Sequence, residues 1–316
     1  MATSAWRAGQ WRPVGEHAKR ALAGAVACRD RHHEARASLL LAQVLTLESR
    51  FQWAHRFASR ARQLFAEDHD TAALFDSSLA LSYVESALGR QEQAMRIAAD
   101  AITGAGLSSR GAAGLNYRGI AAFWNSDYGT ARRVLRAACE LAPEHAGGRA
   151  GLFQPLTNAV CNEVLRCAHA RIAGHRTDLS ELEALVARAW ELVNDGAIGS
   201  VATSFTGAGL LLLEFASCFL ATRSGETEKA DRHYLACLTR AAQLPAGSWM
   251  HGLVWWARLE RTLATGDASQ VHASLEGLTR AAAAGEHAPM KQLAERLCAE
   301  AQSHLARLPS PAATWF

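Results

Sequence analysis

A short turn followed by an alanine-marked helical segment recurs along this chain at intervals of about forty residues. Ala54, Ala94 and Ala131 occupy the same place after three such turns, 40 and 37 residues apart, and Ala230 and Val271 repeat the spacing at 41 residues. Self-similarity at a fixed period of roughly 20 to 50 residues is typical of proteins built from stacked repeats. We therefore expect one continuous repeat array rather than two globular domains.

The composition favours helices within these repeats. The chain of 316 residues is 49% hydrophobic and 20% charged, which is enough apolar material for a large core. Residues 14–142 contain no proline, so nothing in this segment breaks a helix by removing a backbone donor. Alanine and leucine are abundant, and both lose little conformational entropy on entering a helix. The composition therefore predicts an all-α fold.

The clearest repeat unit covers residues 113–143. It resembles the tetratricopeptide repeat (TPR), in which a small residue in the first helix lets the two helices of a hairpin approach and a proline closes the unit. The matching residues are Gly119, Asp127, Tyr128, Ala131, Ala138 and Pro143. Ser126 departs from the pattern because the family has a glycine at this turn position. The resemblance implies that each unit is an antiparallel pair of helices.

Such a helix pair cannot bury its apolar face alone, so neighbouring pairs stack into a solenoid. The resemblance covers roughly residues 5–285 and implies a right-handed superhelix of about seven antiparallel helix hairpins. The common TPR period is about 34 residues. The longer period here resembles the expanded repeats of MalT-like regulatory solenoids in bacterial transcription activators.

We expect residues 1–308 to form a single helical-repeat domain. The expected repeats cover residues 5–30, 33–66, 71–104, 111–143, 149–194, 203–244 and 249–285, followed by a capping helix at 287–308 and a tail or linker at 309–316. The first unit lacks most of its leading helix, so either the N-terminus is abbreviated or the chain was cut from a longer one. A wider spacing around Arg176 and Asp178 predicts an insertion or a longer loop there.

Charge and cysteine content indicate a cytoplasmic protein. The formal net charge is +3, and residues 1–66 carry a net charge of +7 against −4 for the rest; a solvated surface or an acidic partner would each explain the basic end. Seven cysteines form no CxxC pair, which favours buried thiols in a reducing compartment. The N-terminus lacks an apolar signal segment, and Glu214 interrupts the longest apolar stretch, so we expect no membrane association.

Motifs for catalysis are missing from the sequence. It contains no glycine-rich phosphate loop, no HExxH and no GxSxG, and His32, His33 and Glu34 would point in different directions around a helix. We therefore expect a protein that is not an enzyme and that uses no metal or other cofactor. Arginine runs occur at positions 56, 60, 62, 132, 133 and 136. No nucleic-acid recognition motif accompanies them, so direct nucleic-acid binding is not expected.

The TPR resemblance also implies candidate binding residues. In that family the first helices line a concave groove, and the matching positions here carry Arg36, Gln43, Tyr83, Asn116, Phe123 and Trp124. Amide side chains can hold a peptide main chain while aromatic side chains fill pockets, so this set suits an extended peptide or an amphipathic helix. The alternative is that Phe123 and Trp124 pack between neighbouring repeats.

A second candidate is a polar stripe of Asn158, Asn162 and Arg166, which are spaced four residues apart on one helix face. Two amides and a guanidinium group could clamp a carboxylate, although such stripes are also typical of solvated helix faces. The lysines of the family's chaperone-tail clamp have no counterpart here, so we do not expect that particular function.

A third candidate is an aromatic segment near the C-terminal end of the array. Trp249, His251, Trp255 and Trp256 could line an enclosed pocket for a small molecule or peptide. The alternative is that they form an aromatic core helix.

These observations predict a non-catalytic interaction module, the sensory or regulatory region of a bacterial signalling or transcription-regulatory protein. It would bind a protein or peptide partner in the concave groove and bias an attached output domain. The alternative function is a receptor with an enclosed pocket for a small-molecule or peptide signal, such as the sensor region of a nucleotide-cyclase or LuxR-type regulator. Exposed solenoid ends would also allow a homodimer.

Overall fold

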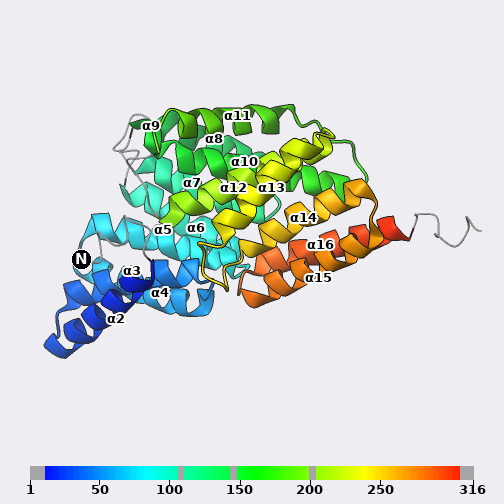
Figure 1. Ribbon diagram of the computed structural model, residues 1–316. Helices are drawn as coiled ribbons and strands as arrows, with labels where there is room; N and C mark the ends of the chain where they lie inside the picture. The colour runs from blue at the N-terminus through cyan, green and yellow to red at the C-terminus, as the bar shows by residue number, and fades with distance from the viewer. Residues whose placement is uncertain (1–10, 106–109, 143–147, 199–203, 307–316) are drawn as a thin grey trace, which may run out of the picture.

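The computed structural model describes residues 11–105, 110–142, 148–198 and 204–306, and every regular element in these ranges is helical (Figure 1). The helices are α2 (Trp11–Cys28), α3 (Arg31–Leu47), α4 (Phe51–Glu67), α5 (Thr71–Ala87), α6 (Gln91–Ala105), α7 (Gly111–Trp124), α8 (Tyr128–Leu141), α9 (Gly148–Gly151), α10 (Phe153–Ile172), α11 (Ser180–Asn194), α12 (Ser204–Arg223), α13 (Thr227–Ala241), α14 (His251–Thr265), α15 (Ala268–Ala284) and α16 (Ala288–Leu305).

The helices pair into hairpins that pack on one another in chain order. The pairs are α3–α4, α5–α6, α7–α8, α10–α11, α12–α13 and α14–α15, with α2 packed on α3 and α16 packed on α15. The predicted all-α, TPR-like solenoid is confirmed. The loop between α10 and α11 is the longer connection expected around residues 176–178, whereas the expected close of a first helix and the tail lie outside the described residues.

A residue in the left-handed backbone region ends the first helix of most hairpins. Gly89, Gly225 and Gly266 have φ values of 84°, 73° and 72°, and glycine adopts this conformation without steric cost. Ser49 and Ser126 take the same place with φ values of 56° and 62°. Ser126 therefore performs the backbone role of the glycine that it replaces in the TPR pattern.

Close approach of the helices within a hairpin depends on small residues. A Cβ atom at Gly119 of α7 would lie 2.5 Å from Cγ of Leu135 in α8, which is closer than carbon atoms can pack. Leu135 is fully buried. The small residue predicted at this position therefore lets α7 and α8 touch.

Four buried glutamates cross-link the array. Glu85, Glu163, Glu214 and Glu260 lie on α5, α10, α12 and α14, the first helices of their hairpins, and each pairs with an arginine, a histidine or both. Removing one partner of a buried ion pair costs more than the pair contributes, because a desolvated charge is left behind. The pairs of Glu85 with His55, Glu163 with Arg132 and Glu260 with Arg171 therefore fix how hairpins sit on each other, whereas Glu214 pairs with His233 and Arg240 inside its own hairpin.

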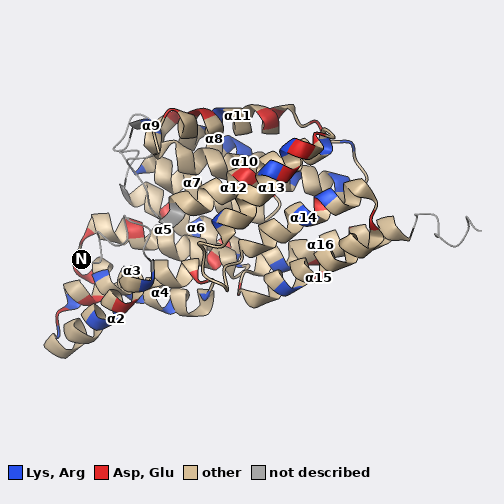
Figure 2. Cartoon of the chain, viewed as in Figure 1, with Lys and Arg blue, Asp and Glu red and all other residues tan. Residues whose placement is uncertain are grey.

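The C-terminal helices return to the N-terminal half of the array. Figure 1 shows the orange C-terminal helices returning toward the blue and cyan N-terminal ones, and α16 contacts both α5 and α10. Basic and acidic residues are interleaved over the visible helices in Figure 2, without a face of a single sign. No described helix is long and apolar enough to cross a membrane.

Candidate functional site

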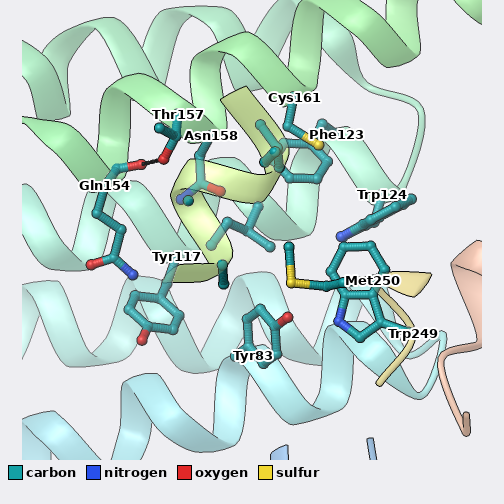
Figure 3. Close-up of a pocket in the computed structure, with 14 residues that line it drawn as sticks. Tyr83, Tyr117, Phe123, Trp124, Gln154, Thr157, Asn158, Cys161, Trp249 and Met250 are labelled. Carbon is teal, nitrogen blue, oxygen red and sulfur yellow. Dashed lines mark hydrogen bonds between the residues drawn. The ribbon is translucent and has the colours of Figure 1, made fainter. Parts of the chain in front are cut away.

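A small cavity lies on the concave side, where four first helices converge. Its volume is about 90 Å³, and its walls come from α5, α7, α10, α12 and the segment before α14 (Figure 3). The lining residues are Tyr83, Tyr117, Ile120, Phe123, Trp124, Gln154, Thr157, Asn158, Cys161, Ala208, Gly209, Leu212, Trp249 and Met250. None of them carries a formal charge at neutral pH. We call this hollow the central cavity.

Aromatic rings form most of the wall of the central cavity. Tyr83 and Tyr117 meet edge to face at 6.3 Å between ring centroids, and Trp124 meets Trp249 in the same way at 5.8 Å. Such edge-to-face pairs are favourable because the positive rim of one ring faces the negative surface of the other. Burial raises the pKa of Tyr117 to about 12, so its hydroxyl group stays protonated and can donate a hydrogen bond.

Polar groups enter the cavity from α10. Asn158 extends toward the cavity in Figure 3, and its amide nitrogen donates to Oδ1 of Asn116 on α7 at 2.9 Å. Gln154, one turn earlier, is exposed at the cavity mouth. The site thus combines an apolar interior with amides at its edge, the combination expected where an apolar group is bound and oriented.

A larger hollow lies on the same concave side, nearer the N-terminus. It has a volume of about 930 Å³, and its walls are formed mainly by α2, α3 and the start of α5. Arg36 and Gln43 line it, together with three carboxylates, those of Asp30, Asp70 and Asp76. Burial raises the pKa of Asp76, although Arg110 opposes the shift. We call this hollow the N-terminal groove.

The structure places five of the six predicted groove residues in the walls of these two hollows. Tyr83, Phe123 and Trp124 line the central cavity, and Arg36 and Gln43 line the N-terminal groove. Asn116 stands behind the cavity wall as the partner of Asn158. Phe123 also belongs to the main hydrophobic core, so the packing role considered for it is present as well.

The predicted polar stripe on α10 splits. Asn158 faces the central cavity, but Asn162 is 1% exposed and donates to Oε1 of Glu163 at 2.9 Å, and Nε of Arg166 donates to Oε2 of Glu163 at 2.7 Å. Burial raises the pKa of Glu163, but hydrogen bonds from Arg132 and Arg166 outweigh it and keep the carboxylate ionised. Asn162 and Arg166 therefore serve an internal ion pair, which corrects the interpretation of the stripe as a clamp for an external carboxylate.

The predicted aromatic pocket near the C-terminus also needs correction. Trp249 lines the central cavity, but Trp256 is fully buried in the core, 4.8 Å from Phe215 between ring centroids. Trp255 packs against Gly277 of α15, and Nε2 of His251 lies 3.0 Å from the carbonyl oxygen of Pro245. Trp255 and Trp256 point into different surroundings because consecutive helical residues are 100° apart, and His251 at the start of the helix turns back to the preceding loop.

Several lining residues were missed by the sequence reasoning. Tyr117 lies beside the predicted groove positions on α7, and Gln154 and Thr157 precede the predicted stripe on α10. A wider helix face, about 100° across, would have included them. Met250 offered no such signal, because it lies in an irregular segment whose path depends on contacts far away in the sequence.

His287 supports the cavity wall from behind. Its ring stacks on Trp249 at 4.4 Å and 24°, and its Nδ1 accepts a hydrogen bond from the backbone N–H of Met290 at 3.1 Å. Among the described residues no hydrogen-bond partner reaches its Nε2. Burial lowers the pKa of His287 to about 3, so the ring is neutral in the folded protein.

The stability of the protein is therefore expected to fall in mild acid. The unfolded chain takes up a proton on residue 287 below pH 6.5 while the folded chain does not, which favours unfolding by about 2 kcal/mol at pH 5. The variant His287→Asn keeps a side chain suited to the start of α16, but it has no group at position 287 that takes up a proton, so this acid destabilisation is lost. Urea unfolding of both proteins at pH 7.5 and pH 5 measures the difference. Equal pH dependence in the two proteins would show that His287 is protonated in the folded state.

Comparisons with known proteins support the fold. No protein-family model matches this sequence, and no curated protein matches it either. Among solved structures, the chain is similar to a Rap protein in complex with competence and sporulation factor, with a TM-score of 0.66 and 12% sequence identity. The match covers 93% of this chain and 74% of that one. At this identity the similarity establishes a TPR-like helical-repeat fold.

Proposed function

We propose that this chain is a non-catalytic interaction module that binds a peptide, or an extended segment of a partner protein, on its concave side. The observation that carries the proposal is the presence of two chemically different hollows on that side. The central cavity is aromatic and uncharged, whereas the N-terminal groove carries three carboxylates against one arginine. A bound peptide could place an apolar side chain in the central cavity and a basic side chain in the N-terminal groove.

The geometry of α5 sets the spacing in such a partner. Asp76 lines the N-terminal groove and Tyr83 lines the central cavity, seven residues further along the same helix. Seven helical residues span about 10 Å, which is the length of about three residues of extended peptide. We therefore propose a partner with a lysine, an arginine or a free amino group about three residues from an apolar side chain.

A non-catalytic role is supported by how the buried carboxylates are used. Glu163 and Glu260 are almost fully buried and are held by arginines, and Glu214 is held by His233 and Arg240. Groups held in structural ion pairs are poor candidates for general acids or bases, because their protonation is fixed by their partners.

We further propose a regulatory role in the cytoplasm of a bacterium, with peptide binding changing the curvature of the solenoid and biasing an attached output domain. The Rap structure is named as a complex with competence and sporulation factor, and the forty-residue period resembles MalT-like solenoids. All seven cysteines are free, and five of them are buried, whereas Cys28 is exposed and Cys298 is half-buried. Burial raises the pKa of Cys161 to about 12, as suits an unreactive apolar thiol.

Selection from a random-peptide library on the intact chain tests this function. The enriched peptides should pair a basic residue with an apolar residue two to four positions away. Asp76→Asn should weaken their binding about tenfold, because one charge-assisted hydrogen bond to the basic residue of the peptide is lost. Asp100→Asn removes an exposed carboxylate from the outer helix α6 and should leave binding unchanged. Enrichment of peptides without a basic residue, or equal effects of the two variants, would contradict the proposed recognition.

The alternative function is a receptor for a small uncharged molecule in the central cavity alone. It is favoured by one observation, that no charged side chain lines this cavity. Ala208→Leu would fill the cavity, whereas Gly207→Leu places the same side chain outside its lining on the same helix. A neutral molecule that co-purifies with the chain and with Gly207→Leu, but not with Ala208→Leu, would support this alternative over the peptide.

A further inference from the structure

Three segments that are far apart in the sequence meet beside the central cavity. They are the turn at residues 48–50, the loop at 247–249 and the turn at 285–287. The backbone N–H of Trp249 donates to Oγ of Ser49 at 2.9 Å, and the backbone N–H of Glu286 donates to the carbonyl oxygen of Ser49 at 3.1 Å. We call this junction the clasp, because it joins the first described hairpin to the last one.

The backbones in the clasp are in direct contact. A Cβ atom at Gly247 would lie 3.3 Å from the carbonyl oxygen of Glu48, and a Cβ atom at Gly285 would lie 3.1 Å from Cβ of Ser49. Glycine has no Cβ atom, so the backbones at positions 247 and 285 can approach Glu48 and Ser49 this closely without a clash. The sequence is therefore adapted on both sides to bring these segments together.

Ser49 is unusual among the turn residues that it resembles. Its φ of 56° is the conformation that glycine adopts at the corresponding turn positions 89, 225 and 266. Ser126 shares the conformation, but its side chain is exposed, whereas Ser49 is 1% exposed. A side chain in this conformation is strained. The hydroxyl group that binds Trp249 gives a reason for serine at position 49.

Glu286 caps the N-terminus of α4 from the other side of the clasp. The residue before α4, Arg50, provides no side-chain cap, and the first turn of α4 contains no acidic residue. Oε2 of Glu286 instead accepts the backbone N–H of Gln52 at 2.7 Å. A carboxylate is stabilising at this end of a helix, where N–H groups lack partners and the helix dipole is positive. The clasp thus supplies the cap that α4 lacks.

The clasp and the central cavity share a wall. The ring of Trp249 stacks on His287 at the clasp and also lines the cavity with Trp124, and His287 lies 4.9 Å from Trp124 between ring centroids. A volume of about 90 Å³ is smaller than the roughly 150 Å³ that admits benzene in another protein. In this closed form the cavity has no room for a peptide main chain.

We propose that the clasp holds the solenoid closed over its concave side and that it must open to admit a peptide to the central cavity. The second half of this statement rests on the proposed function, whereas the first half does not. Opening would move Trp249 away from Ser49, which removes one wall of the cavity and leaves the α4 N-terminus without its carboxylate.

A matched pair of serine variants tests the clasp. Ser49→Gly and Ser126→Gly both relax a left-handed backbone, but only Ser49→Gly removes the acceptor of the Trp249 N–H. Hydrogen exchange measured on the intact chain should be at least tenfold faster at residues 247–252 and 285–288 in Ser49→Gly and unchanged there in Ser126→Gly. Equal exchange in the two variants would overturn the clasp. Should Ser49→Gly not fold, Glu286→Ala removes the carboxylate from the α4 N-terminus and is expected to accelerate exchange at residues 52 and 285–288.

A reversible lock tests the opening step. The Cβ atoms of positions 49 and 285 would lie 3.1 Å apart, a few tenths of an ångström closer than the roughly 3.5 to 4.5 Å of a disulfide. A small separation of the two turns therefore lets Ser49→Cys with Gly285→Cys be cross-linked, and Cys28→Ser removes the exposed native thiol. A library-selected peptide should bind the reduced form at least tenfold faster than the oxidised form. Equal association rates would overturn the gate. If no peptide is selected, the proposed function fails, while the exchange experiment still decides the clasp.

Discussion

Replacing Arg171 by methionine is expected to lower the free energy of unfolding by about 2 to 3 kcal/mol. Arg171 lies on α10, and its guanidinium group contacts Glu260 of α14 at 2.6 Å and Glu300 of α16 at 2.8 Å. Glu260 is only 3% exposed, and without Arg171 it keeps Arg223 as its one arginine partner and the indole N–H of Trp256 as a donor, so the buried carboxylate is compensated only in part. The variant keeps the apolar stem of the side chain, so the loss of stability reports the removal of the ion pair and not a loss of packing.

The pH dependence of this variant identifies the cause of the loss. Burial raises the pKa of Glu260, and removing Arg171 raises it further, so the folded variant is more stable when the carboxyl group is protonated. Urea unfolding should show part of the stability returning at pH 5.5 and the largest deficit at pH 8. Arg149→Met is the control, because its pair with Asp195 is exposed and should contribute less than about 1 kcal/mol. A deficit independent of pH would assign the effect to packing.

Replacing Gly119 by valine is expected to lower the free energy of unfolding by about 3 kcal/mol. The new side chain would overlap Leu135, which is fully buried and has no free space to occupy, so α7 and α8 would be pushed apart. Because the central cavity is lined from α7, its shape would change as well. Thermal unfolding and chemical denaturation both measure the loss.

The control for this variant is Gly24→Ala on α2. Nothing lies within 4 Å of a Cβ atom at Gly24, and the residue is exposed. Alanine is favoured over glycine inside a helix by about 0.5 to 1 kcal/mol, so this variant should be slightly more stable than the parent protein. If Gly119→Val were equally harmless, the close approach of α7 and α8 would not depend on a small residue.

The fold could be predicted from the sequence because it depends on local patterns. The turn at Ser126 and Asp127, the small residue at Gly119 and the alanine register all act within one hairpin, and stacking repeats that local geometry. The concave position of Tyr83, Phe123 and Trp124 followed from the same register. These features need no knowledge of contacts between distant segments.

The candidate site could be predicted only in part, because its closure depends on long-range contacts. Trp249 reaches Ser49 across 200 positions, and nothing in the spacing of either residue indicates the other. Arg166 likewise pairs with Glu163, and the spacing of the polar stripe does not indicate that Glu163 is buried. Their closeness in sequence predicts one pocket for Trp249 and Trp256, yet Trp256 belongs to the core and Trp249 to the cavity wall.

The position of a bound peptide decides whether the concave side is the functional face. Hydrogen exchange of the intact chain should be measured with and without a library-selected peptide at saturating concentration. We expect protection in the residues of α3, α5, α7 and α10 that line the two hollows, above all at 36–43, 76–83 and 117–124. Protection confined to the outer helices α4, α6 and α8, or a library that yields no binding peptide, would contradict a peptide-binding function for this face.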